Sequence, residues 1–352
     1  MVLDAARRAV TSGNIGGNNV PDAEARVVRR LRDEPIVAAG AAVGYGPMFN
    51  AGLAHHYGRY HLFVRAVREG YRPGPEGGPR FIDYLSDIVV FDSEDGHKYR
   101  FGYVLAPAGT DGALCFEDPR VQWVEQRGQP RLVMTYTHLP SNEAEPWRIG
   151  AHQLSWDGAR FHLGESTGRL LGPAGMPNKD AVIFTLESGR VALLHRIHPD
   201  VQLALFDDFD HLWQATDEDY WDAHVAELER HTLLRPSPGA LGIGAGAPPV
   251  PTEAGLLLFF HERRADGSYT MNLALLDAAT GRVKCRLSSP VLEPELDWER
   301  RGDVHDVIFV QGAHRVGDHV YLTYGAADRH VGAAVASLPR LLDALAREEA
   351  CA

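Results

Sequence analysis

Residues 115–121 read Cys-Phe-Glu-Asp-Pro-Arg-Val, so two carboxylates and a guanidinium stand at the mouth of an apolar, strand-like run. Charges packed this closely are costly to bury, which favours a wet and functional setting for Glu117, Asp118 and Arg120. A carboxylic acid in such a setting can protonate a leaving oxygen, as the cleavage of a glycosidic bond requires. The alternative is that each charged group only ties one strand end to another by a hydrogen bond.

The segments that must position these residues are mostly strand patterns, broken by Gly, Pro and Asp-Gly turns. One unit recurs five times, with starts 68, 62, 68 and 58 residues apart. Five such units predict an all-β fold, a five-bladed β-propeller with one four-stranded sheet per blade. A large β-sandwich with coincidental spacing is the alternative. The units begin at Phe49, Glu117, Lys179, Ala247 and His305.

Helix patterns are confined to a few short segments, over 21–33, 220–234 and 337–350. The last of these begins with Ser337 as a candidate N-cap and has Pro339 in its first turn. We therefore expect an N-terminal helical extension over residues 1–40, a propeller catalytic domain over 41–336 and a C-terminal helix over 337–352.

Composition narrows the class of protein. The 352-residue chain is 45% apolar and has a net charge of −12, which argues against a nucleic-acid partner, because such a partner needs a basic stripe. No run of about 18 apolar residues predicts a transmembrane helix, and the N-terminus has no apolar signal core. Without an HExxH or a paired CxxC motif, we expect no metal site. The three cysteines, Cys115, Cys285 and Cys351, read as reduced thiols in a cytoplasmic protein.

A propeller would bring distant polar residues together, because its innermost strands line one central funnel. Carboxylates, arginines and aromatic groups in such a funnel suit a small oligosaccharide, whose hydroxyls need many paired donors and acceptors. The polar residues at the unit starts are Asn50, Asp118, Lys179, Asp180 and Asp306. Those near the ends of the following strands are Arg65, Tyr136, His195, Arg196, His261, Glu262 and Asp328.

Four stretches in order along the chain resemble glycoside hydrolase family 130. They read FEDPRV, NKDAVIF…GRVALLHRIHPD, GIGAGAPPVPTEAGLLLFFH and GAADRHVGAAVASL, and the likeness runs from about Gly46 to about Leu345. The resemblance implies a five-bladed propeller and an inverting enzyme that acts on β-mannosides, as a phosphorylase or as a hydrolase. It implies no cofactor, with inorganic phosphate as co-substrate in a phosphorylase. A homo-oligomer is possible for such a protein.

The resemblance also implies roles for single residues. Asp118 matches the catalytic acid, whose proton reaches the glycosidic oxygen through the mannosyl 3-hydroxyl. Asn50, Arg65 and Asp328 match residues that hold the mannosyl unit, and Arg120 and Tyr136 are expected beside them. Burial and neighbouring charges are expected to raise the pKa of Asp118. The residues expected to bind phosphate are Lys179, Arg196, His261 and Tyr269.

One position departs from the phosphorylase pattern, because Gly242 stands where those enzymes usually carry a lysine. Three basic groups clustered without an anion would repel one another, so Lys179, Arg196 and His261 still favour a bound phosphate. If the protein is a hydrolase, Glu262 is the one candidate for a water-activating base; otherwise it is a surface acid paired with Arg263 or Arg264. A glycan-binding propeller with weakened catalysis and an enzyme of a biosynthetic pathway are further alternatives.

Overall fold

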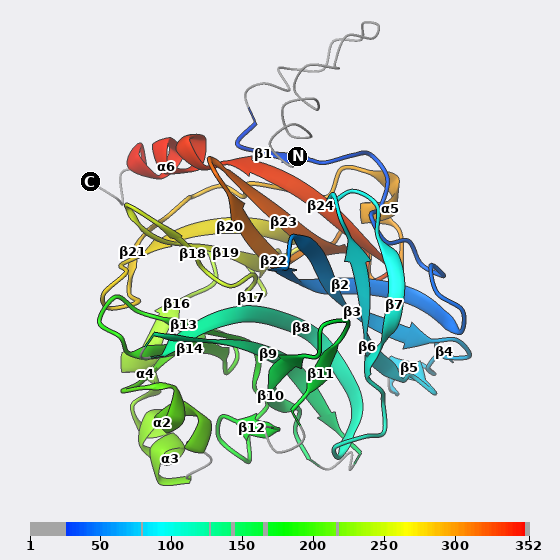
Figure 1. Cartoon of the computed structure of the whole chain (residues 1–352), viewed down its shortest axis with the longest axis horizontal. Helices are drawn as coiled ribbons and strands as arrows, with labels where there is room; N and C mark the ends of the chain where they lie inside the picture. Colours follow the sequence, from blue (N-terminus) through cyan, green and yellow to red (C-terminus); the bar gives the residue numbers. More distant parts are fainter. Residues whose placement is uncertain are drawn as a thin grey trace, which may run out of the picture.

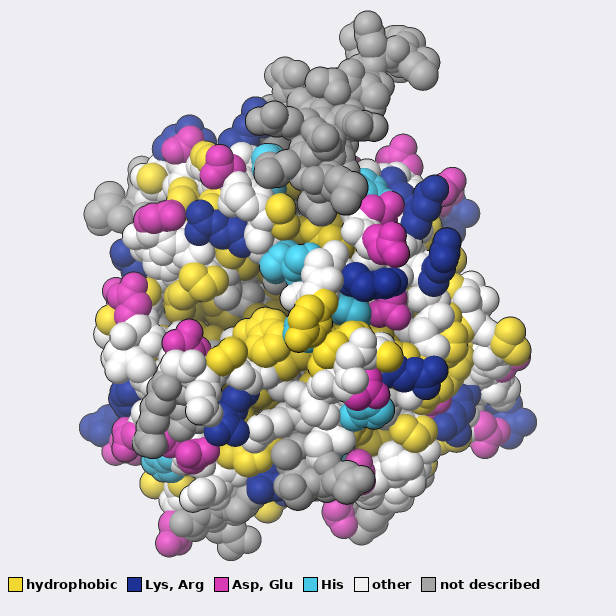
Figure 2. Space-filling model, in the orientation of Figure 1, with side chains coloured by type: hydrophobic (Ala, Val, Ile, Leu, Met, Phe, Trp, Pro, Cys, Tyr) yellow, Lys and Arg dark blue, Asp and Glu magenta, His cyan; other side chains and the backbone are white. Residues whose placement is uncertain are grey.

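The computed structural model describes residues 26–348 except 79, 127, 142–144, 165–167 and 216–217. Its strands form five antiparallel sheets arranged as blades around one axis (Figure 1), which confirms the predicted five-bladed propeller. The innermost strand of each blade lies near the middle of the view in Figure 1. Charged side chains of both signs are interspersed around the periphery of the face in Figure 2, whereas hydrophobic side chains gather near its middle.

The first two blades follow one another along the chain, each running from the axis outward. Blade I contains β2 (Tyr45–His56), β3 (Arg59–Arg68), β6 (Ser86–Ser93) and β7 (Arg100–Ala106), with a small added hairpin of β4 (Arg72–Pro73) and β5 (Phe81–Ile82). Blade II contains β8 (Ala113–Gln126), β9 (Gln129–Pro140), β10 (Arg148–Trp156) and β11 (Phe161–Leu163), and β12 (Arg169–Leu171) also pairs with β10.

The remaining three blades complete the ring. Blade III contains β13 (Lys179–Thr185), β14 (Val191–Arg196), β15 (Val201–Phe206) and β16 (Thr232–Leu234). Blade IV contains β17 (Gly242–Ala245), β18 (Val250–Thr252), β19 (Gly255–Arg263), β20 (Tyr269–Leu276) and β21 (Val283–Arg286). Blade V contains β22 (Ile308–Val316), β23 (His319–Ala326), β24 (His330–Ser337) and, outermost, β1 (Val28–Arg30).

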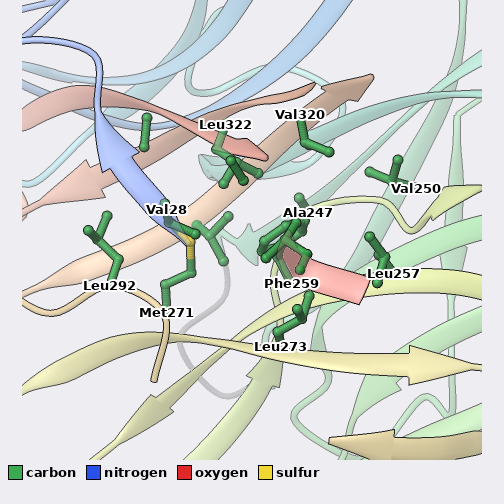
Figure 3. Packing of buried hydrophobic residues seen from close by; sticks show 14 of the residues in the cluster. Val28, Ala247, Val250, Leu257, Phe259, Met271, Leu273, Leu292, Val320 and Leu322 are labelled. Carbon is green, nitrogen blue, oxygen red and sulfur yellow. The ribbon is translucent and has the colours of Figure 1, made fainter. Parts of the chain in front are cut away.

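The hydrophobic core is divided among the contacts between neighbouring blades. Within the described residues, five buried clusters are found, one between each pair of adjacent sheets. Figure 3 shows the cluster between blades IV and V, where Phe259 and Met271 face Leu322 and Val28. Because both faces of most strands are covered in this way, long apolar runs such as those of β19 and β23 suit this fold.

The first described strand closes the ring. Val28 pairs with Ala336 and Arg30 with Ala334, so β1 is the outer strand of the last blade. The buried Glu299 holds it in place, accepting hydrogen bonds from Arg30 Nε and Nη2, both at 2.7 Å. The helix predicted over 21–33 is therefore wrong at Val28–Arg30, because the free edge of β24 outweighs local helix propensity. The rest of that segment up to residue 25 lies outside the described residues.

The helices are short and lie outside the blades. Helices α2 (Phe209–Gln214), α3 (Glu218–Ala226) and α4 (Leu228–His231) lie between β15 and β16, and α5 (Asp297–Arg300) precedes β22. The single helix predicted over 220–234 is instead two helices, α3 and α4, separated at Glu227, and β16 begins at Thr232. The predicted C-terminal helix is confirmed as α6 (Leu338–Ala346), with Pro339 in its first turn, although the Ser337 side chain makes no capping hydrogen bond. No helix in the described part of the chain combines the length and hydropathy needed to cross a bilayer.

The cysteine expectation is only partly correct. Cys115 is free and buried, but Cys285 is disulfide-bonded, so the prediction of reduced thiols is wrong for Cys285. Disulfides are rare in cytosolic proteins, and the cysteine argument for a cytoplasmic protein therefore no longer holds.

Candidate active site

A shared backbone conformation aims polar residues at the propeller axis. Asn50, Asp118, Asp180 and Asp306 have φ of 48°, 51°, 55° and 55°, in the left-handed region. Each is the second residue of a recurring unit, and the strand pairing is irregular just after three of them. Asn and Asp tolerate this conformation better than other side chains except Gly. The spacing of the units therefore places equivalent polar side chains on four of the five blades.

Asp118 lies at the centre of a compact polar cluster. It is 5% exposed, and its Oδ1 accepts hydrogen bonds from Asn50 Nδ2 at 2.7 Å and from Arg65 Nη1 at 3.0 Å. Arg65 also donates through Nη2 to Glu117 and, at 2.8 Å, to Tyr84 Oη. One guanidinium thus bridges the two neighbouring carboxylates of the Glu-Asp-Pro-Arg motif. Its positive charge offsets the repulsion between them.

The charges of this cluster separate the pKa values of its carboxyl groups. Burial alone would raise the pKa of Asp118, but Arg65, Lys179 and the hydrogen bond from Asn50 outweigh burial and lower it. The expected raised pKa of Asp118 is therefore wrong. Burial does raise the pKa of Glu117, against the opposing effect of Arg65.

Asp328 approaches the same cluster from the turn between β23 and β24. Its φ is 53°, and its side chain is half-buried. Burial raises its pKa to about 6, opposed by Arg65 and reinforced by Asp118. Asn50, Arg65, Asp118 and Asp328, which come from three blades, are thus brought together as the sequence predicts.

A second cluster is organised around Asp180. This carboxylate is 1% exposed, and Arg120 Nη2 donates to its Oδ1 at 3.1 Å. Its Oδ2 lies 3.2 Å from Arg196 Nε and 3.6 Å from His261 Nε2. Burial alone would raise the pKa of Asp180, but Arg196, His261 and Arg120 hold it well below its usual range. Only Gly fits at position 244, because a Cβ there would lie 2.4 Å from both Asp180 Oδ2 and His261 Nε2.

The Asp180 cluster corrects two expectations. Arg120 is 1% exposed, and all three of its nitrogens donate to protein acceptors, which include the carbonyl oxygens of Ala245 and Gly246. It therefore supports the site from behind and does not reach a sugar. The cations were also expected to lack an anion, but Asp180 already balances part of their charge, so mutual repulsion alone does not call for a bound phosphate.

The other groups expected to bind phosphate surround this cluster. Lys179 pairs with Arg196 across β13 and β14, and its Nζ lies 6.0 Å from the centre of the Trp147 ring. Burial lowers the pKa of His261, and neither of its ring nitrogens has a hydrogen-bond partner within the described residues. The ring of Tyr269 lies 6.2 Å from that of His261. Arg196 and His261 thus lie beside Asp180, with Lys179 next to Arg196 and Tyr269 next to His261.

Tyr136 is not part of the funnel. It is 4% exposed, packs against Phe116 and stacks on His152 with ring centres 5.9 Å apart. Thr137, and not Tyr136, pairs with Glu117, just as Arg65 pairs with Phe49 in blade I. Because alternate strand residues face opposite sides of a sheet, Tyr136 points into the core, and its predicted contact with substrate is wrong.

Glu262 is likewise turned away. Its carboxylate accepts hydrogen bonds from Ser237 N at 2.7 Å, Ser237 Oγ at 3.0 Å and Arg286 Nη2 at 3.2 Å. Arg286 lies on β21, the outermost strand of blade IV, and Ser237 lies between β16 and β17. Because neighbouring strand residues face opposite sides of a sheet, Glu262 faces away from His261 and cannot serve as a base in the funnel. It is also not the surface partner of Arg263 or Arg264 that the alternative required, because it is only 6% exposed.

Sequence reasoning gave no role to Glu117, Tyr84 or Asp180. Glu117 stands in the Glu-Asp-Pro-Arg motif and Asp180 at a unit start. Their positions alone could therefore have indicated that both belong to the site, although the family resemblance assigned them no role. Tyr84 follows the β4–β5 hairpin of blade I, and no sequence feature marks it. Its ring stacks on Phe81 with centres 5.4 Å apart and lies 5.5 Å from the Arg65 guanidinium, so it helps to orient Arg65.

Comparison with known proteins agrees with this geometry. A family model described as β-1,4-mannooligosaccharide phosphorylase, that of glycoside hydrolase family 130, matches residues 42–347. A β-1,2-mannobiose phosphorylase of a Thermoanaerobacter species is 32% identical over 296 residues, covering 82% of this chain and 89% of the relative. A 1,2-β-oligomannan phosphorylase of the same organism is 28% identical over 321 residues, covering 88% and 96%.

The fold has a solved counterpart. The structure of the β-1,2-mannobiose phosphorylase from Listeria innocua in complex with β-1,2-mannobiose superposes with a TM-score of 0.73 at 21% identity, covering 91% of this chain and 99% of that one. By the match of the family model and of the relatives in sequence, the chain belongs to glycoside hydrolase family 130, whose members are phosphorylases or hydrolases that act on β-mannosides.

Proposed function

We propose that the protein is an inverting β-mannoside phosphorylase that releases mannose 1-phosphate from a β-mannosyl oligosaccharide. One observation carries the choice of phosphorolysis over hydrolysis. The cationic side chain of Lys179 is close enough to Asp118 to lower its pKa, and Arg196 pairs with Lys179 across the strands, whereas Glu262, the acid offered as a hydrolytic base, is hydrogen-bonded to Ser237 and Arg286 on the opposite face. Phosphate favours Arg and Lys donors.

In the proposed reaction, a phosphate oxygen attacks C1 of the terminal mannosyl unit as the bond from C1 to the glycosidic oxygen breaks. The proton of Asp118 passes to that oxygen through the mannosyl 3-hydroxyl, and α-mannose 1-phosphate and a shortened mannoside leave. Asn50, Arg65 and Asp328 hold the mannosyl unit, while Lys179, Arg196, His261 and Tyr269 hold the phosphate. His261 acts as a neutral hydrogen-bond donor, because burial lowers its pKa.

Phosphate dependence of product formation tests this function. Incubation with β-1,2-mannobiose, the substrate suggested by the names of two relatives, should give mannose 1-phosphate only when phosphate is added. β-1,4-Mannobiose is the comparison substrate, because the family model carries the β-1,4 name. Release of free mannose at a rate indifferent to phosphate would contradict the proposal and leave a hydrolase.

Asp328 should make mannoside binding depend on pH. As pH falls through the pKa of about 6, the carboxylate gains a proton and can no longer accept two hydrogen bonds from sugar hydroxyls. If only the ionised form binds, the Kd of β-1,2-mannobiose should rise about tenfold per pH unit below pH 6. Calorimetry without phosphate, between pH 4.5 and 8, measures this separately from the titration of phosphate itself. The Asp328→Asn variant should bind weakly with no such slope, and a flat wild-type profile would remove Asp328 from the mannosyl site.

A further inference from the structure

We propose that Arg263 is a phosphate-binding residue, and that it supplies from β19 the cation that this chain lacks at Gly242. The inference rests on the proposed phosphorylase function and deepens it. It assigns the missing positive charge of the phosphate site to a different strand of the same blade.

The strand register places Arg263 between Gly242 and Tyr269. In blade IV, Arg263 pairs with Gly242 on β17 and with Tyr269 on β20. The backbone of Arg263 is therefore the direct cross-strand neighbour of the glycine that replaces the lysine. It is also the neighbour of a tyrosine already placed beside His261.

Strand alternation decides the direction of the side chain. His261 and Arg263 are two residues apart on β19, so they share one face of the sheet. The guanidinium carbon of Arg263 lies 5.8 Å from the centre of the Tyr269 ring. The neighbours of Arg263 are occupied elsewhere: Glu262 is bonded to Ser237 and Arg286, and Arg264 is paired with Glu293.

Arg263 is available for an anion, unlike the other arginines of the site. Arg120 and Arg196 both contact Asp180, whereas the Arg263 side chain is exposed and has neither a hydrogen bond nor an ion pair within the described residues. A guanidinium offers two parallel N–H groups to one phosphate, and its flat face stays on the aromatic ring. Arg263 therefore brings an unneutralised charge to a cluster that Asp180 partly neutralises.

The space at Gly242 explains how one cation can replace the other. A Cβ added at Gly242 would meet no atom within 4 Å, in contrast to the crowded Gly244 two residues later. The first carbon of a side chain restored at position 242 would therefore meet no neighbour. Arg263 is the direct cross-strand neighbour of this open position.

Binding of inorganic phosphate alone tests the assignment without turnover. Calorimetric titration of the full chain should show a Kd for phosphate that is about ten- to a hundredfold higher in Arg263→Ala than in the wild type, the effect of one lost charged hydrogen bond. The Kd for β-1,2-mannobiose should stay the same in this variant. The matched control is Arg264→Ala, which removes the next arginine, whose guanidinium is paired with Glu293, and should leave phosphate affinity unchanged.

Restoring the lysine provides the converse test. In the Arg263→Ala background, Gly242→Lys should recover most of the lost phosphate affinity, because the cation returns to the same space. Equal phosphate affinity in the wild type and Arg263→Ala, or an equal loss in Arg264→Ala, would overturn the role of Arg263 and leave the phosphorylase function intact. Absence of phosphate binding by the wild type would overturn both.

Discussion

Replacing Asp118 by Asn should lower the kcat for phosphorolysis of β-1,2-mannobiose by about 10²–10⁴-fold, the usual contribution of a general acid. Asn has the same shape, and its side-chain oxygen can still accept from Asn50 and Arg65 as Asp118 does. The variant loses the transferable proton and the negative charge that faces Arg65. Initial rates of mannose 1-phosphate release measure the effect, and a variant that kept a tenth of the wild-type rate would show that Asp118 is not the donor.

Two controls separate proton donation from a structural role. Calorimetry should show that Asp118→Asn still binds β-1,2-mannobiose, because the hydrogen-bond acceptor remains. A mannoside with a good leaving group, such as 2,4-dinitrophenyl β-mannoside, needs no proton on that group. The variant should therefore approach the wild-type rate with this substrate, whereas a misfolded or misaligned site would remain slow with both substrates.

The lowered pKa of Asp118 has a mechanistic consequence. Arg65, Lys179 and Asn50 favour the carboxylate form of Asp118, yet an acid must carry a proton when the glycosidic bond breaks. A phosphate beside Lys179 would offset part of that positive field and raise the pKa of Asp118. The arrangement thus links the presence of the nucleophile to the readiness of the acid, in keeping with phosphorolysis.

The sequence predicts the structure best at the starts of the recurring units. The regular spacing identified the inner strands, and polar residues at their starts indicated a polar funnel, whereas the left-handed backbone of Asn50, Asp118, Asp180 and Asp306 emerged only from the structure. Tyr136 and Glu262 show where this reasoning ends. Each lies one residue from a position that faces the funnel, and a shift of one residue reverses the direction of a strand side chain. Spacing alone does not resolve a single residue.

Other features depend on contacts that no local pattern contains. Val28–Arg30 reads as part of an amphipathic helix, and only the open edge of β24 and the buried Glu299 make it a strand. The role of Asp180 depends on two arginines and a histidine from three different strands. The sequence shows that these three residues are basic. It does not show that the buried carboxylate of Asp180 lies among them.

Asp180→Asn should lower the free energy of unfolding by about 3–5 kcal/mol, the usual cost of breaking a buried ion pair by removing one partner. The side chain keeps its size, but Arg120, which is 1% exposed, then holds a buried charge with only carbonyl partners. Urea unfolding at pH 7 measures the change. The matched control is Asp306→Asn, the same substitution at the same φ of 55°, whose carboxylate forms no ion pair within the described residues. It should cost no more than about 0.5 kcal/mol.

The stabilising effect of the Asp180 carboxylate should depend on pH. Because Arg196, His261 and Arg120 hold the folded-state pKa of Asp180 well below its usual range, its stabilising effect is fully present above the unfolded-state pKa of about 3.9. The effect is lost as pH falls through the lower folded-state value. The difference between the wild type and Asp180→Asn should therefore be constant from pH 7 to about pH 5 and shrink in stronger acid. An equal loss of stability in Asp306→Asn would contradict the assignment of the effect to the ion pairs of Asp180.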